Sequence, residues 1–231
     1  MKETDKAIFL HRIHFSESSL IVTFYTFRNG LQKFIFQGGK KKPSGLFPLS
    51  LSEINYYRRP DSDLGKVTNV QPYHMLHQLT GNPLKSTIAF FIGDVLKQCL
   101  QTDQSDPGLF YFVEQQIILL DAEEEVSLFA LKFLLQFAEH MGIDPSLEAV
   151  NKKYFYLQDG EFSDSERRGE IVSNQATAEL IQELLRSNKT EGFPKETKQE
   201  TLETLLLYYK LHIPKFDVQK SLEIVRDILY T

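Results

Sequence analysis

The chain has 231 residues, of which 42% are hydrophobic and 25% are charged, and its formal net charge is −5. This composition excludes disorder over the whole length and collagen-like sequence, because there is enough apolar side chain for a core. The single cysteine, Cys99, excludes an internal disulfide and a zinc site made of cysteines alone, and it indicates a cytosolic protein. At about 150 residues per domain, the length predicts one or two domains.

The charge is unevenly distributed along the chain. Residues 1–80 contain 11 Lys or Arg and 6 Asp or Glu, a net +5, whereas residues 81–231 contain 15 and 25, a net −10. A basic segment on an otherwise acidic chain is typical of a domain that binds nucleic acid or another polyanion. Chance clustering of charge is the alternative, since +5 is small for a nucleic-acid-binding domain.

The first eighty residues show the two-residue alternation of apolar and polar side chains that predicts β-strands. Strands are expected within residues 7–15, 20–27, 31–37, 51–57 and 66–70. Asn29-Gly30 separates the second strand from the third, and this dipeptide is the strongest short hairpin signal. Five short strands predict a small closed or partly closed barrel. An SH3-like barrel is an alternative that the number of strands does not exclude.

Beyond Thr80 the apolar residues recur at helical spacing. Asn82-Pro83 and Asp106-Pro107 each combine an N-cap residue with proline at the first helical position. Five or six helices are expected. The first begins at Asn82-Pro83 and continues to Cys99, and the second follows Asp106-Pro107 in residues 109–120. The others are expected in residues 126–141, 174–186, 195–213 and 221–230. The fold class is therefore a two-domain α+β protein, with a barrel in residues 1–80 and an all-α domain in residues 81–231. Within the second domain, residues 154–174 are expected to form an irregular insert, either a loop or a hairpin.

No enzymatic motif is found. The sequence lacks a P-loop, a Gly-x-Gly-x-x-Gly motif, a Gly-x-Ser-x-Gly elbow and a His-Glu-x-x-His pair. His74 and His77 have metal-ligand spacing, but two ligands do not hold zinc, so they are interpreted as surface histidines. The sequence therefore predicts a binding protein with no catalytic centre, cofactor or metal. A hydrolase without a recognisable motif is the least favoured alternative.

Basic residues of the first segment gather at predicted strand ends, close to Tyr56 and Tyr57. Phosphates require cations, and bases require flat faces on which to stack, so this combination is typical of a site for single strands. A solvated lysine-rich loop is the alternative. The candidate DNA-binding residues are Lys33, Lys40, Lys41, Lys42, Arg28, Arg58, Arg59 and Lys66.

Several segments have a family resemblance when they are taken in order. They are residues 7–12 (AIFLHR), 15–22 (FSESSLIV), 26–30 (TFRNG), 38–41 (GGKK), 46–49 (LFPL) and 53–56 (EINY). Their order and spacing resemble the bacterial recombination mediator RecO family. The resemblance is densest in residues 7–70 and spans nearly the whole chain.

Membership of that family would imply an N-terminal OB-fold and a helical C-terminal domain. It would imply binding of single- and double-stranded DNA, annealing of complementary strands, and help in loading the RecA recombinase. The implied partners are RecR, in some systems RecF, and the acidic C-terminal tail of single-stranded DNA-binding protein; the implied location is the cytoplasm, with the nucleoid. Lys33 and the three lysines of residues 40–42 match the family's basic loop. Lys132 is a candidate cation for binding the tail peptide.

The chain departs from the family at one place. Many members carry a four-cysteine zinc module, whereas residues 154–174 contain no cysteine. Zinc is therefore not expected, and Tyr154, Phe155, Tyr156 and Phe162 are expected to form a small apolar cluster there instead. Arg167 and Arg168 are candidates for a second DNA surface. A protein-interaction scaffold, whose barrel binds a protein and not DNA, remains the alternative function.

Overall fold

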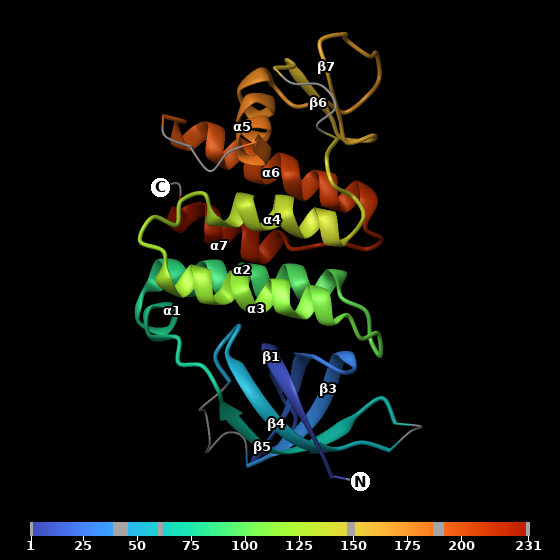
Figure 1. Cartoon of the computed structure of the whole chain (residues 1–231), viewed down its shortest axis with the longest axis vertical. Helices are drawn as coiled ribbons and strands as arrows, with labels where there is room; N and C mark the ends of the chain where they lie inside the picture. Colours follow the sequence, from blue (N-terminus) through green and yellow to red (C-terminus); the bar gives the residue numbers. More distant parts are fainter. Residues whose placement is uncertain (1, 39–45, 60–61, 147–150, 187–191, 230–231) are drawn as a thin grey trace. The chain divides into compact units, whose positions relative to one another are not determined.

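The computed structural model describes residues 2–38, 46–59, 62–146, 151–186 and 192–229 (Figure 1). The chain divides into two compact units, Met1–Glu123 and Glu124–Thr231. Within the described ranges, none of the helices combines the length and the apolar character needed to cross a membrane.

The first unit contains a closed five-stranded barrel. Its strands are β1 (Lys2–His14), β2 (Ser19–Thr26), β3 (Gly30–Gln37), β4 (Leu51–Tyr57) and β5 (Gly65–Pro72). They are arranged in the order β1-β2-β3-β5-β4, and β4 pairs with β1 to close the barrel. The β3–β5 pair is parallel, and the other pairs are antiparallel. This is the topology of an OB-fold, so the expectation from the family resemblance is confirmed and the SH3-like alternative is not.

Alternate side chains of each strand fill the barrel, which is why the two-residue periodicity was informative. The interior is rich in aromatic rings: Phe24 contacts Phe9 with ring centroids 5.6 Å apart, and Phe34 contacts Tyr56 at 5.0 Å. Tyr56 is 2% exposed, whereas its neighbour Tyr57 is 46% exposed. Alternation therefore places Tyr56 in the core and Tyr57 on the outer surface.

The Asn29-Gly30 signal does join β2 to β3 as a hairpin. Thr26 Oγ1 donates a hydrogen bond to the carbonyl oxygen of Gly30 at 3.0 Å. Gly30 has φ = +64°, and a Cβ atom built on it would lie 2.1 Å from the backbone oxygen of Gln104. Both the backbone conformation and the close approach therefore require glycine at this position.

Three helices belong to the same compact unit as the barrel: α1 (His77–Gly81), α2 (Pro83–Cys99) and α3 (Pro107–Ala122). Both predicted helix starts are confirmed. The side chain of Asn82 accepts from the backbone N–H of Leu84 at 2.9 Å, and that of Asp106 accepts from Leu109 at 2.9 Å. The short helix α1 was not predicted. The division at residue 80 remains a prediction, made from the change of secondary structure.

His77 is the first residue of α1, and His74 lies before the helix. The two histidines therefore do not share a helical face. Cys99 is the last residue of α2, where burial raises the pKa of its thiol to about 12.

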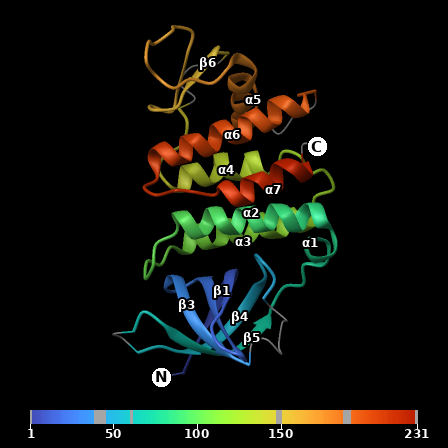
Figure 2. The same ribbon diagram turned by 180° about the vertical axis from the view of Figure 1, so that it is seen from behind.

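The second unit contains four helices in its described part: α4 (Phe129–His140), α5 (Gln175–Arg186), α6 (Lys195–His212) and α7 (Gln219–Leu229). Helices α4 and α6 lie side by side (Figure 2). Tyr209 of α6 donates its hydroxyl hydrogen to the carbonyl oxygen of Leu134 at 2.6 Å and stacks on Phe137 at 6.4 Å. Helix α4 starts three residues later than the predicted residue 126. The described residues also form one helix more than the six expected, because α1 was not predicted.

The insert contains a short hairpin, β6 (Tyr154–Tyr156) and β7 (Glu161–Ser163). Its predicted aromatic cluster forms in part: the rings of Phe155 and Phe162 are 4.9 Å apart. Phe155 also packs on Tyr208 of α6 at 5.3 Å. The cluster thus attaches the hairpin to a helix and is not a self-contained core.

Candidate nucleic-acid interface

Two of the predicted cations lie on one exposed face of the barrel. Lys33 and Ile35 point outward from β3, because Phe34 between them fills the core. Lys66 of β5 is the cross-strand partner of Ile35, and Tyr57 of β4 is the partner of Lys66. Partners in a ladder share a face. The structure therefore brings Lys33, Lys66 and the exposed ring of Tyr57 together.

An apolar row continues this face across the neighbouring strands. Ile35 pairs with Ile21 of β2, and Ile21 pairs with Ile13 of β1, which is 50% exposed. Phe15, just beyond β1, is 57% exposed. Together, Ile13, Ile21, Ile35, Lys66 and Tyr57 form what we call the outer row. With Lys33 on the same face, the outer row offers two ammonium groups for phosphates and flat or apolar side chains for bases.

The sequence points to part of the outer row only. Tyr57 is one of two candidate tyrosines, whereas the three isoleucines lie within predicted strands and have no local signal that they share a face. Their common signal is strand register, because each is an outward residue directly opposite the next. Register between strands that are distant in the chain cannot be read from local alternation.

The described side chains of Lys33 and Lys66 are exposed and have no ion pair with another described residue. Arg59, which follows β4, is also exposed. These three cations meet the first electrostatic requirement for contacts with phosphate, which is access to solvent.

Arg28 lies in the turn between β2 and β3, apart from the outer row. Its backbone N–H donates to Asp5 Oδ2 at 3.0 Å, and its side chain is exposed. Burial raises the pKa of Asp5, although the hydrogen bond from Arg28 acts in the opposite direction. The turn that carries Arg28 is therefore attached to a buried acid of β1.

Arg58 is held in a network of hydrogen bonds. Its Nε donates to the carbonyl oxygen of Ser62 at 3.0 Å, and its Nη2 donates to Asp103 Oδ2 at 3.0 Å. Its Nη1 donates to Gln32 Oε1 and to Asp103 Oδ1. Gln32 completes the network by donating to Asp103 Oδ1 at 3.0 Å and to the carbonyl oxygen of Asn29 at 2.8 Å.

This network shifts the titration of both charged groups. The hydrogen bond to Asp103 raises the pKa of Arg58, and the hydrogen bonds from Arg58 and Gln32 lower the pKa of Asp103. Asp103 lies in residues 100–106, between α2 and α3, and no local sequence pattern indicates that it reaches the barrel. Unlike Lys33 and Lys66, Arg58 already has an anionic partner within the protein.

Lys40, Lys41 and Lys42 lie outside the described residues. Gly38, the described residue before them, donates its backbone N–H to the carbonyl oxygen of Ser18 at 3.0 Å. Their assignment to phosphate contacts therefore stays a prediction.

In the second unit, Lys132 lines a cavity of about 480 Å³. Leu135, Leu184 and Leu185 supply apolar walls, but Glu139 and Asp144 line the same cavity. The predicted cation is thus next to an apolar surface, as a peptide with an acidic and aromatic end would require. The two acids oppose the binding of such a peptide.

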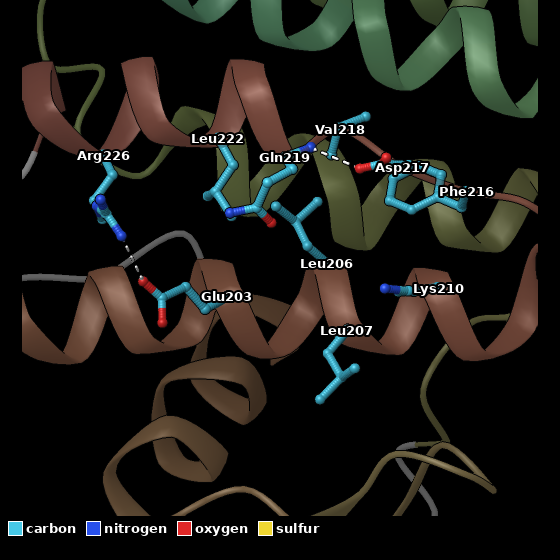
Figure 3. A pocket seen from close by; sticks show the side chains of 10 residues that line it. All are labelled: Glu203, Leu206, Leu207, Lys210, Phe216, Asp217, Val218, Gln219, Leu222 and Arg226. Atoms are coloured by element: carbon cyan, nitrogen blue, oxygen red, sulfur yellow. Dashed lines mark hydrogen bonds and ion pairs between the residues drawn. The ribbon is translucent and has the colours of Figure 1, made fainter.

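A second cavity, of about 330 Å³, lies between α6 and α7 (Figure 3). Leu206 and Lys210 come from α6, and Leu222 and Arg226 come from α7. Arg226 already forms an ion pair with Glu203, with 3.9 Å between nitrogen and oxygen. This cavity had no counterpart among the sequence predictions.

Arg167, a candidate for a second DNA surface, is engaged within the insert. It forms ion pairs with Asp159 at 2.8 Å, Glu161 at 2.7 Å and Glu170 at 3.5 Å, and it lies over the ring of Tyr156 at 4.6 Å. The hydrogen bond with Glu161 raises its pKa. Arg167 therefore organises the insert, whereas its neighbour Arg168 is exposed.

No group of three or more His, Cys, Asp or Glu side chains in the described part of the chain is arranged to hold a metal ion.

Comparisons with known proteins agree with the barrel and with the order of the two parts. Residues 1–76 match the family described as Recombination protein O N terminal, and residues 81–222 match Recombination protein O C terminal. The chain is 29% identical to the DNA repair protein RecO of Phocaeicola vulgatus and 26% identical to that of Flavobacterium johnsoniae, each over 240 residues and 99% of both chains. It is 25% identical to the DNA repair protein RecO of Christiangramia forsetii over 233 residues, which cover 96% of this chain and 97% of the relative. With an OB-fold barrel under the first match and helices under the second, the chain belongs to the Recombination protein O (RecO) family.

Proposed function

We propose that this protein is a recombination mediator in DNA repair that acts by binding and not by catalysis. It binds single- and double-stranded DNA, anneals complementary strands and assists the loading of RecA together with RecR. The observation that carries the proposal is the outer row, in which Lys66 lies between Tyr57 and Ile35 and Lys33 lies on the same face.

Each part of this face has a physical task. The ammonium groups of Lys33 and Lys66 neutralise phosphates and displace condensed counterions, which favours binding without base specificity. Tyr57 offers an exposed ring on which a base can stack. Neutralised phosphates repel a second strand less, so a bound strand can pair with its complement.

The proposed protein partners are those that membership of the RecO family implies. The structure suggests a binding site for one of them, the tail peptide. RecR, and in some systems RecF, would associate with the mediator at the nucleoid. The acidic tail of single-stranded DNA-binding protein would bind at the Lys132 cavity, where an ammonium group adjoins leucine side chains.

The test of DNA binding is the anisotropy of a labelled single-stranded oligonucleotide, titrated with the protein at several salt concentrations. If about four phosphates are neutralised, log K falls with a slope near −3 against log salt. Double reversal of Lys33→Glu and Lys66→Glu is expected to abolish the salt-sensitive binding. The control is Lys210→Glu with Lys220→Glu, which changes the net charge equally in the second unit.

Other outcomes would favour the alternative function, a protein-interaction scaffold whose barrel binds a protein and not DNA. A binding constant that stays flat up to about 0.3 M salt contradicts the electrostatic mechanism. Charge reversal of Lys40, Lys41 and Lys42 extends the test to the loop: unchanged DNA binding by all the variants would leave the barrel as a surface for a protein partner.

A further inference from the structure

The Arg58 network contains an acid placed where a phosphate would bind. Asp103 accepts from both terminal nitrogens of Arg58, and this two-point geometry is the one in which arginine holds carboxylates and phosphates alike. The side chain of Asp103 is 54% exposed, whereas that of Arg58 is 18% exposed. The carboxylate thus covers the guanidinium from the solvent side.

The position of Arg58 connects this pair to the proposed DNA face. Arg58 follows Tyr57 directly, and Tyr57 is the cross-strand partner of Lys66. A strand advances about 3.3 Å per residue. Side chains of successive strand residues point to opposite faces, so the Arg58 guanidinium reaches Gln32 at the end of the barrel and not the face of Tyr57. A DNA strand that stacks a base on Tyr57 brings a phosphate to Arg58 where it continues past the end of β4.

The backbone of the Asp103 segment is attached to the barrel by contacts that do not involve Asp103. Leu31 donates its backbone N–H to the carbonyl oxygen of Gln101 at 3.1 Å, and Ser105 Oγ donates to the carbonyl oxygen of Phe27 at 3.1 Å. The segment can therefore stay in place when the Asp103 side chain leaves Arg58.

We propose that Asp103 is an internal competitor for DNA phosphate: its carboxylate occupies Arg58 until a phosphodiester displaces it. Arg58 is then a phosphate-binding residue whose availability is limited by the chain itself, and Asp103 reduces the affinity for DNA. This inference rests on the proposed DNA binding by the barrel and describes how that site is regulated.

The Asp103 side of the pair is open to solvent, so a phosphate can approach the Arg58 guanidinium from that side and exchange with the carboxylate. Gln32 remains beside Arg58 in either state, because it also donates to the carbonyl oxygen of Asn29. The guanidinium therefore keeps its position while its anionic partner changes.

The test compares Asp103→Asn with the parent protein in the same anisotropy titration. Asparagine is suited to this position, because Asp103 has φ = +59° and asparagine tolerates the left-handed region. Affinity for single-stranded DNA is expected to rise about two- to fivefold, the range that corresponds to an exposed ion pair. The slope of log K against log salt should steepen by about 0.7, which corresponds to one more phosphate.

Two control variants separate this mechanism from a general change of charge. Glu53→Gln removes one negative charge from an exposed position on β4 and touches no member of the network, so it should give a smaller gain and an unchanged slope. Combining Asp103→Asn with Arg58→Gln should remove the gain. If the gain persists without Arg58, or if Asp103→Asn behaves like Glu53→Gln, the inference is wrong.

A stability measurement accompanies the titration. If Asp103→Asn is unfolded, Asp103→Gly removes the carboxylate while keeping a residue that accepts positive φ. A folded Gly variant with unchanged affinity overturns the inference but leaves the proposed function in place. Absence of DNA binding by the parent and by both variants overturns the proposed function as well.

Discussion

Lys132 has two opposing sets of neighbours. The leucines of its cavity favour an apolar or aromatic ligand group, whereas Glu139 and Asp144 partly neutralise its charge. A peptide carboxylate would therefore depend strongly on this ammonium group, because Lys132 is the one cation among the described residues that line the cavity.

Lys132→Glu should weaken binding of an acidic peptide with an aromatic end by at least about tenfold, since a hydrogen bond to a charged group contributes about 1.5–3 kcal/mol. Calorimetric titration with a synthetic tail peptide measures the effect. Lys210→Glu is the matched control, because Lys210 lines the cavity between α6 and α7. A larger loss of peptide affinity with Lys210→Glu than with Lys132→Glu would indicate that the peptide binds in the cavity between α6 and α7.

The insert shows how an element is held together without a metal. The hydroxyl of Tyr156 donates to the carbonyl oxygen of Ser165 at 2.6 Å and accepts from the backbone N–H of Arg167 at 3.0 Å. The ring of Tyr156 supports the Arg167 guanidinium, and that group pairs with three carboxylates. One tyrosine thus connects two parts of an otherwise polar segment.

Removal of that hydroxyl tests this account. Tyr156→Phe should destabilise the insert by about 0.5–1.5 kcal/mol, because the part-buried hydrogen bonds of the hydroxyl with Ser165 and Arg167 are lost. Hydrogen exchange of residues 154–174 should accelerate. Tyr154→Phe removes the same atom from a half-buried ring whose hydroxyl has no hydrogen bond with another described residue. Equal effects of the two variants would show that the Tyr156 hydroxyl has no special role.

The same elements show what the sequence can predict. Helix starts at Asn82 and Asp106 and the hairpin at Gly30 were predictable, because each depends on residues that are neighbours in the chain. The outer row and the Arg58–Asp103 pair were not, because they join residues from strands and loops that are distant in the sequence. The sequence shows the charge of Arg58, and only the fold shows that this charge already has a partner.

At the scale of the whole molecule, two criteria divide the chain differently. The secondary structure changes near residue 80, and the family matches end at residue 76 and resume at residue 81. Spatial contacts instead group α2 and α3 with the barrel, in the unit Met1–Glu123. Each compact unit has a buried core of its own, which makes cooperative unfolding testable unit by unit.

Phe133→Ala is a suitable perturbation, because Phe133 of α4 is fully buried and stacks on Phe137 with centroids 5.4 Å apart. A loss of about 3–5 kcal/mol is expected. Hydrogen exchange should accelerate in α4 and α6, while the barrel strands, α2 and α3 keep their protection. Acceleration of α2 and α3 together with α4 would place the cooperative boundary near residue 80.

Cys99 has a practical consequence for fluorescence work. Burial raises the pKa of its thiol to about 12, so far less of it is ionised at pH 7 than of an ordinary cysteine. Maleimide dyes react with the thiolate, so the native side chain competes poorly for them. A cysteine introduced at the exposed position Ser18 would therefore carry nearly all of the dye. Distances from the barrel to labelled oligonucleotides could then be followed without replacing Cys99.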